Sequence, residues 1–127
     1  MTQPPVRIYH NARCSKSRSA CSILEAQGLQ AEVIDYLKTP PSREELWHLI
    51  GLLGVKPLDL VRQGEPLFKE RYAGRALSDE AWVEALAAHP ELLERPIVVR
   101  GDRAIVARPP EKLLNWLETS QSEPGPR

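Results

Sequence analysis

The sequence is poor in cysteine and in aromatic residues, and it has no excess of either charge. Of its 127 residues, two are Cys and 6% are aromatic, while 17 Lys and Arg are balanced by 17 Asp and Glu. Two cysteines are too few for a disulfide framework. The charge balance argues against a nucleic-acid-binding protein that works through a broad basic face, but it is compatible with a local basic pocket for a small anion.

Long apolar runs are also missing. No run approaches the ~20 residues of a membrane helix, and the N-terminal "MTQPPVRIYH" has no apolar segment of signal-peptide length. The hydrophobic content of 42% and the charged content of 27% are typical of a soluble globular protein of one domain. We therefore expect a cytoplasmic protein with reduced thiols and with neither a membrane nor a nucleic acid as its partner.

The first third of the chain has the pattern of a strand, a helix and a strand. "VRIYH" (6–10) indicates a short strand, a helical pattern begins at Ser17 and stops at Gly28, and "AEVIDYL" (31–37) indicates a second strand. Three such elements within about thirty residues predict a βαβ unit with a right-handed crossover.

A block of helices is expected at about 42–90. Ser42 and Glu45 form a capping-box pattern at its start, and Gly54 is placed to end the first helix. Residues 57–88 are helical in pieces. This block interrupts the sequence of strands.

The last third predicts a hairpin followed by a helix. "PIVVR" and "AIVAR" are short strands joined around Gly101-Asp102, and the helix opens at Pro109 and Pro110 with an apolar side formed by Leu113, Leu114 and Leu117. The order βαβ, helices, ββα predicts an α/β, thioredoxin-like domain over residues 1–118, with a mixed four-stranded sheet and an inserted helical block. The remaining residues, 119–127, are expected to form a disordered tail.

Cys14 lies between the first expected strand and the first expected helix. Unpaired backbone N–H groups and the positive end of the helix dipole stabilise a thiolate at such a position and lower the thiol pKa. Arg13, Lys16 and Arg18 add nearby positive charge, and His10 on the preceding strand adds more when it is protonated. These features predict that Cys14 is a nucleophile.

The segment "CSKS" predicts chemistry with a single thiol. A Cys-x-x-Cys pair at this turn is typical of dithiol redox proteins, but here Ser17 occupies the fourth position. Cys21 lies seven residues along the helix, a rise of roughly 10 Å, whereas bridged cysteines need Cα atoms within about 7 Å. We interpret Cys21 as a small buried side chain near an apolar helix face.

"IYHNARCSKSR" resembles the active-site segment of the ArsC family, the arsenate reductases that use glutathione and glutaredoxin. The resemblance continues, in the family order and with similar separations, through "YLKTPPSREEL", "VRQGEP", "HPELLERPIVV" and "ARPPEKLL". It covers residues 6 to about 118. It implies a thioredoxin-like fold with a helical insertion.

The resemblance also implies roles for individual residues. Cys14 attacks arsenate, Arg62, Arg95 and Arg108 hold the oxyanion, and His10 favours the thiolate. Guanidinium groups suit this task because each binds an oxyanion bidentately and none loses its proton. Glutathione then adds to the adduct, glutaredoxin removes the mixed disulfide, and arsenite leaves. Glutathione is thus a co-substrate, and neither a bound cofactor nor a metal is expected.

Three positions depart from the family pattern. Ala12 replaces a proline, and Ser15-Lys16 replaces Gly-Thr. Pro96, in contrast, matches the proline, commonly in cis, that precedes the third strand of thioredoxin-like folds.

The departures at Ala12, Ser15 and Lys16 leave two other functions open. One is a thiol oxidoreductase acting on glutathione mixed disulfides or on another oxyanion. The other is a transcription regulator of the Spx type, although Spx proteins usually carry a Cys-x-x-Cys switch.

Overall fold

The computed structural model describes residues 5–121, in which four strands form one mixed sheet. The strands are β1 (Val6–His10), β2 (Ala31–Asp35), β3 (Ile97–Arg100) and β4 (Arg103–Val106), and their order in the sheet is β2-β1-β3-β4. β1 runs parallel to β2 and antiparallel to β3, and β4 runs antiparallel to β3. The predicted thioredoxin-like topology is confirmed.

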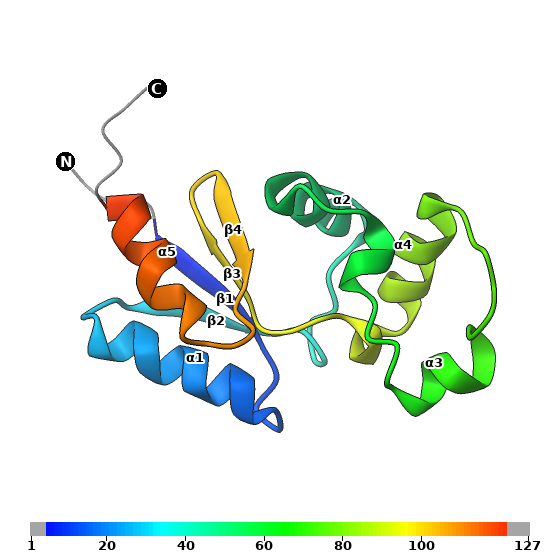
Figure 1. The fold of residues 1–127 in the computed structure, drawn as a ribbon, viewed down its shortest axis with the longest axis horizontal. Coiled ribbons are helices and arrows are strands. Elements are labelled where there is room, and N and C mark those ends of the chain that lie inside the picture. The colour runs from blue at the N-terminus through cyan, green and yellow to red at the C-terminus, as the bar shows by residue number, and fades with distance from the viewer. Residues whose placement is uncertain (1–4, 122–127) are drawn as a thin grey trace.

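Two helices cover one face of the sheet (Figure 1). They are α1 (Ser15–Ala26) and α5 (Lys112–Gln121). Because side chains alternate along a strand, β1 and β3 each send some side chains to this face and others to the opposite one. The core on this side contains Val6, Ile8, Ala20, Leu24, Val98, Ala107, Leu113 and Leu117.

The inserted helices lie on the opposite side of the sheet (Figure 1). They are α2 (Arg43–Leu53), α3 (Pro66–Arg71) and α4 (Asp79–Ala88), with short 3-10 turns at Pro57–Leu60 and Pro90–Leu92. These elements span residues 43–92 of the chain. Tyr9, Ile97 and Val99 from the sheet pack into its larger core.

Local signals explain the limits of α2. The Ser42 hydroxyl accepts a hydrogen bond from the Glu45 N–H at 3.1 Å, and Gly54 ends the helix with φ of 67°. The other half of the predicted capping box is replaced by a long-range contact, because the Glu45 carboxylate accepts a hydrogen bond from the Tyr9 hydroxyl. This contact ties α2 to β1.

Element ends differ from the sequence prediction in several places. α1 begins at Ser15 instead of Ser17, and β2 ends at Asp35 because the chain turns there, with the Thr39 N–H bonded to the Asp35 carbonyl at 2.9 Å. α5 continues to Gln121, so the helix includes residues 119–121 of the predicted tail. Residues 122–127 lie outside the described part of the chain.

The apolar stripe predicted for α5 is wrong at Leu114. Leu113 is 0% exposed and belongs to the core, whereas Leu114 is 47% exposed, because adjacent helical residues point about 100° apart. We expect Leu113→Ala to lower the free energy of unfolding by about 2–5 kcal/mol. Leu114→Ala should change it by less than about 0.5 kcal/mol. Urea denaturation of both variants measures the difference, and equal losses would contradict the observed packing.

Within residues 5–121, no helix combines the length and the apolar character needed to cross a membrane.

Candidate active site

A tight turn between β1 and α1 holds Cys14 at the start of the helix. The Cys14 N–H donates to the Asn11 carbonyl at 2.9 Å, and the Asn11 side-chain oxygen accepts from the Arg13 N–H at 2.9 Å. Cys14 has extended backbone angles and is the N-cap residue of α1, and its carbonyl accepts the Arg18 N–H at 3.1 Å. Cys14 therefore lies at the end of α1 where the first N–H groups of the helix have no partner within it.

These surroundings lower the pKa of the Cys14 thiol from 9.0 to about 7. Burial alone would raise it, but hydrogen bonds to the sulfur from the Ser17 N–H, the Arg95 side chain, the Lys16 N–H and the Ser17 hydroxyl outweigh burial. All four donors favour the charged form. A substantial fraction of Cys14 is therefore a thiolate at neutral pH.

The lowered pKa predicts the pH dependence of alkylation. The iodoacetamide rate should rise with pH, reach half of its maximum near pH 7 and level off above it, because only the thiolate reacts. The measurement uses the Cys21→Ser protein so that a single thiol is modified. A midpoint at or above the ordinary value of about 8.5 would contradict the described environment of Cys14.

The sequence suggested that His10, Arg13, Lys16 and Arg18 lower the pKa of Cys14. In the structure, these four side chains make different contacts. Lys16 is among the main contributors to the lowered Cys14 pKa, but through its backbone N–H. The Arg13 side chain is exposed, and Arg18 Nη1 donates to the Ala12 carbonyl at 2.7 Å. His10 Nδ1 lies 3.6 Å from the sulfur of Cys21, so its contact is with the other thiol.

Ser17 contributes to the stabilisation of the Cys14 thiolate, which sequence reasoning missed. In the sequence, this residue indicated only that a second redox cysteine is lacking. Ser17 is fully buried, its hydroxyl accepts the Asn11 N–H at 3.4 Å, and both its N–H and its hydroxyl help to lower the pKa of Cys14. A hydroxyl at the fourth position of "CSKS" therefore supports the thiolate.

The three predicted oxyanion-binding arginines lie in one cluster, interleaved with two glutamates. Arg62 pairs with Glu65 at 3.4 Å and with Glu94 at 3.2 Å. Arg95 lies 3.8 Å from Glu65, and Arg108 lies 4.0 Å from Glu94. Arg108 also donates to the Arg95 carbonyl at 3.0 Å. The structure thus brings together cations from three separate segments.

A short β-bridge holds Arg62, which belongs to the helical block, next to the segment that precedes Arg95. Val61 and Leu93 form an isolated antiparallel bridge, in which the Arg62 N–H donates to the Leu92 carbonyl and the Glu94 N–H donates to the Leu60 carbonyl, each at 2.7 Å. Arg62 and Arg95 share the Glu65 carboxylate as a partner, and Arg95 in turn helps to lower the pKa of Cys14. The peptide bond that precedes Pro96 is cis, as the resemblance implied, and so is the bond from Arg108 to Pro109.

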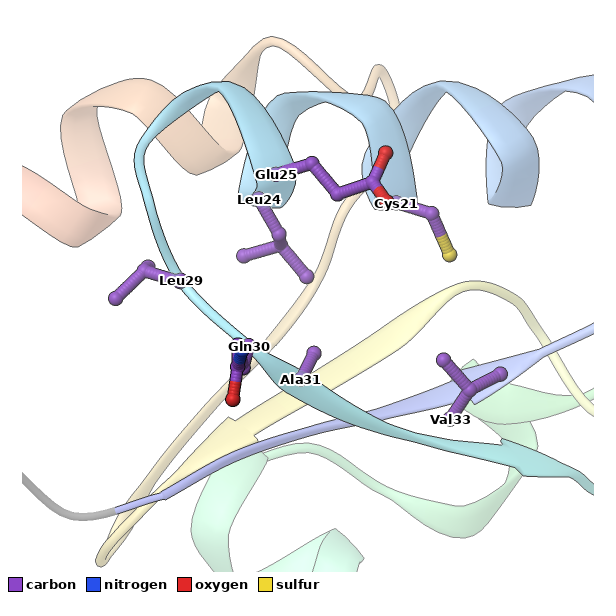
Figure 2. A pocket seen from close by; sticks show the side chains of 7 residues that line it. All are labelled: Cys21, Leu24, Glu25, Leu29, Gln30, Ala31 and Val33. Carbon is purple, nitrogen blue, oxygen red and sulfur yellow. The ribbon is translucent and has the colours of Figure 1, made fainter.

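Cys21 lies beside a different hollow, between α1 and β2. Figure 2 shows Cys21 and Leu24 pointing from α1 towards Ala31 and Val33 on β2. The hollow measures about 250 Å³, and its seven lining residues include the carboxylate of Glu25 but no Lys or Arg. Burial, followed by the charge of Glu25, raises the pKa of Cys21. Both features disfavour anion binding and nucleophilic attack at this thiol.

The arrangement around Cys14 suits a reaction between a thiolate and an oxyanion. It combines a thiol of lowered pKa at the start of a helix with Arg95, which shares the Glu65 carboxylate with Arg62 and accepts a hydrogen bond from Arg108 at its carbonyl. Among residues 5–121, no group of three or more His, Cys, Asp or Glu side chains is arranged to hold a metal ion.

The sequence from residue 9 to residue 116 matches the ArsC family. This chain belongs to the ArsC family. The matched segment contains Cys14 and all three arginines of the cluster, so the described site lies entirely within the ArsC region.

Several ArsC relatives resemble the chain over most of its length. The uncharacterized protein YfgD of Escherichia coli K12 is 45% identical over 111 residues, 86% of this chain and 93% of YfgD. An arsenate reductase of Neisseria meningitidis serogroup A is 44% identical over 112 residues, 87% of this chain and 96% of that protein. The solved structure of an arsenate reductase from Vibrio cholerae is 46% identical with a TM-score of 0.85, and the match covers 90% of this chain and 98% of that one.

Proposed function

We propose that this protein is an arsenate reductase that uses Cys14 as its single redox-active thiol. The observation that carries the proposal is the position of Arg95. The Arg95 side chain helps to lower the pKa of the Cys14 thiol, and the residue also belongs to the cluster that contains Arg62 and Arg108. A tetrahedral oxyanion held by these arginines therefore lies next to the nucleophile. The names of the Neisseria and Vibrio relatives support arsenate as that oxyanion.

The first step is attack of the Cys14 thiolate on arsenic. A sulfur–arsenic bond forms and an arsenic–oxygen bond breaks, and the oxygen leaves as water after it takes up protons from the solvent. The thiolate is available at neutral pH because the Cys14 pKa is about 7. The arginines neutralise the substrate charge and the charge that builds up on its oxygens during attack.

Glutathione and glutaredoxin are proposed to supply the electrons. The glutathione sulfur joins Cys14 in a disulfide, while arsenic takes the electron pair of its bond to sulfur and leaves as arsenite. A glutaredoxin thiol then removes glutathione from Cys14. In net terms, one arsenate and two thiols give one arsenite, one disulfide and one water. An external thiol is required because Ser17 stands where a resolving cysteine would be.

A coupled assay tests the proposal. The purified protein is mixed with arsenate, glutathione, glutaredoxin, glutathione reductase and NADPH, and arsenate-dependent NADPH oxidation and arsenite are measured. We expect turnover only when arsenate and both thiol components are present. Absence of arsenite with every component present would reject the activity. Turnover with glutathione alone, or with a thioredoxin system in place of glutaredoxin, would reject the proposed donor.

A second candidate is a thiol oxidoreductase acting on glutathione mixed disulfides. It is favoured by the pairing of a lowered Cys14 pKa with Ser17 in place of a second cysteine, since deglutathionylation needs one reactive thiolate and no oxyanion. A glutathionylated peptide discriminates the two activities. Turnover of the peptide without turnover of arsenate would favour this candidate.

A further inference from the structure

Tyr36, directly after β2, is a fully buried tyrosine with an unpaired hydroxyl. Within residues 5–121, its oxygen makes no hydrogen bond of good geometry, and neither does the buried Nε atom of Arg95. Buried polar atoms are nearly always paired, because an unpaired one loses its hydration without compensation. Two such atoms in one small region therefore call for a structural explanation.

Tyr36 and Arg95 lie at the same end of the sheet as Cys14, because Asp35 pairs with His10 at the end of β1 and Ile97 pairs with Tyr9. Burial raises the pKa of Tyr36, while the charge of Arg95 and contacts from the Asn11 and Arg95 side chains oppose this effect. Burial lowers the pKa of Arg95, but Tyr36 and Cys14 raise it and prevail. Because the influence is mutual, Tyr36, Arg95 and Cys14 form one contiguous group, with Asn11 of the active-site turn at its border.

We propose that Tyr36 is a positioning residue whose hydroxyl oxygen accepts a hydrogen bond from the Arg95 guanidinium and holds that group against the Cys14 sulfur. A guanidinium only donates and a phenol oxygen accepts, so the polarity of this contact is fixed. Tyr36 therefore acts on the reacting sulfur through Arg95.

Other acceptors make such a restraint necessary. Arg95 Nη1 donates to the Glu91 carbonyl at 3.2 Å, and Nη2 lies 3.8 Å from the Glu65 carboxylate. Both acceptors belong to the helical block and its connections, and they compete with Cys14 for the guanidinium. The inference rests on the proposed role of Cys14 as nucleophile, but it does not require arsenate to be the substrate.

The test is the pH profile of Cys14 alkylation in the Cys21→Ser protein, with and without Tyr36→Phe. Phe fills the same volume without the unpaired oxygen, so the thermal unfolding curve should show that the variant folds. We expect the alkylation midpoint to rise from about 7 by about 0.5–1 pH unit, because the thiolate loses part of its stabilisation by Arg95. Tyr9→Phe is the matched control, since Tyr9 is also buried but bonds to Glu45. Its midpoint should not move.

A double-mutant cycle separates positioning from a general structural effect. In an Arg95→Ala background, Tyr36→Phe should cause no further shift, because the two residues act through one contact. An unchanged midpoint in Tyr36→Phe, or an equal shift with and without Arg95, would overturn the proposal. A parent midpoint near 9 would overturn both this proposal and the activation of Cys14. A coupled shift in a protein that does not reduce arsenate would uphold the positioning role and reject the proposed function.

Discussion

Cys14→Ser is expected to lower arsenate reduction by roughly 10³-fold or more, because a serine hydroxyl supplies no thiolate to attack arsenic and forms no disulfide. The fold should persist, since Cys14 is only partly buried and its backbone makes the turn contacts to Asn11 and Arg18. The measurement is the steady-state rate of arsenite formation in the coupled assay, with circular dichroism as the check on folding.

Cys21→Ser is the matched control for this loss. Cys21 lies on the same helix but borders the hollow next to β2, and its pKa is raised. We expect this variant to keep most of the activity. If both serine variants were equally inactive, a scheme with a single thiol would be wrong, and a disulfide between the two cysteines would have to form after local unwinding of α1.

Arg95→Ala is expected to reduce kcat/KM for arsenate by about 30- to 5,000-fold, corresponding to roughly 2–5 kcal/mol for a desolvated charge contact. The loss has two sources, because Arg95 both helps to lower the pKa of Cys14 and belongs to the arginine cluster. The alkylation midpoint of Cys14 should therefore rise in parallel. Steady-state kinetics and the alkylation profile measure these two effects separately.

Two further variants make the Arg95 result specific. Arg95→Lys should restore only part of the activity, because an ammonium lacks the planar fork of a guanidinium. Arg43→Ala removes an exposed arginine that pairs with Glu84 at 2.7 Å, far from Cys14 in the sequence, and it should leave kcat/KM and the midpoint unchanged. Full activity in Arg95→Ala would remove the arginine cluster from the mechanism.

The sequence predicted the fold well because its signals are local and mutually consistent. β1, α1 and β2 follow from periodicity, Ser42 and Gly54 delimit α2, and the turn at Gly101-Asp102 joins β3 to β4. The errors arose where local patterns are ambiguous. Leu114 is apolar but faces outwards on α5, and the start of α1 at Ser15 depends on the N-capping geometry of Cys14.

The site was only partly predictable, because several of its contacts join distant segments. The position of Cys14 at a strand-to-helix turn is a local feature, but the meeting of Arg62 with Arg95 depends on the bridge between Val61 and Leu93. Glu65 and Glu94 lie inside the quoted motifs "VRQGEP" and "HPELLERPIVV", yet nothing in their spacing distinguishes them from surface charges. The sequence likewise gives no sign that the ring of His10 meets Cys21.

The two glutamates act as tethered counter-ions for the arginine cluster. Three guanidinium groups and two carboxylates carry a formal charge of +1, so the cluster by itself avoids most of the repulsion between like charges in partly buried surroundings. In the proposed reaction, Glu65 and Glu94 would hold the arginines in place between one anion and the next. An arriving ion would have to compete with these carboxylates, so we expect a small monovalent ion such as chloride to bind weakly. We expect an oxyanion with two charges and several acceptor oxygens to compete better.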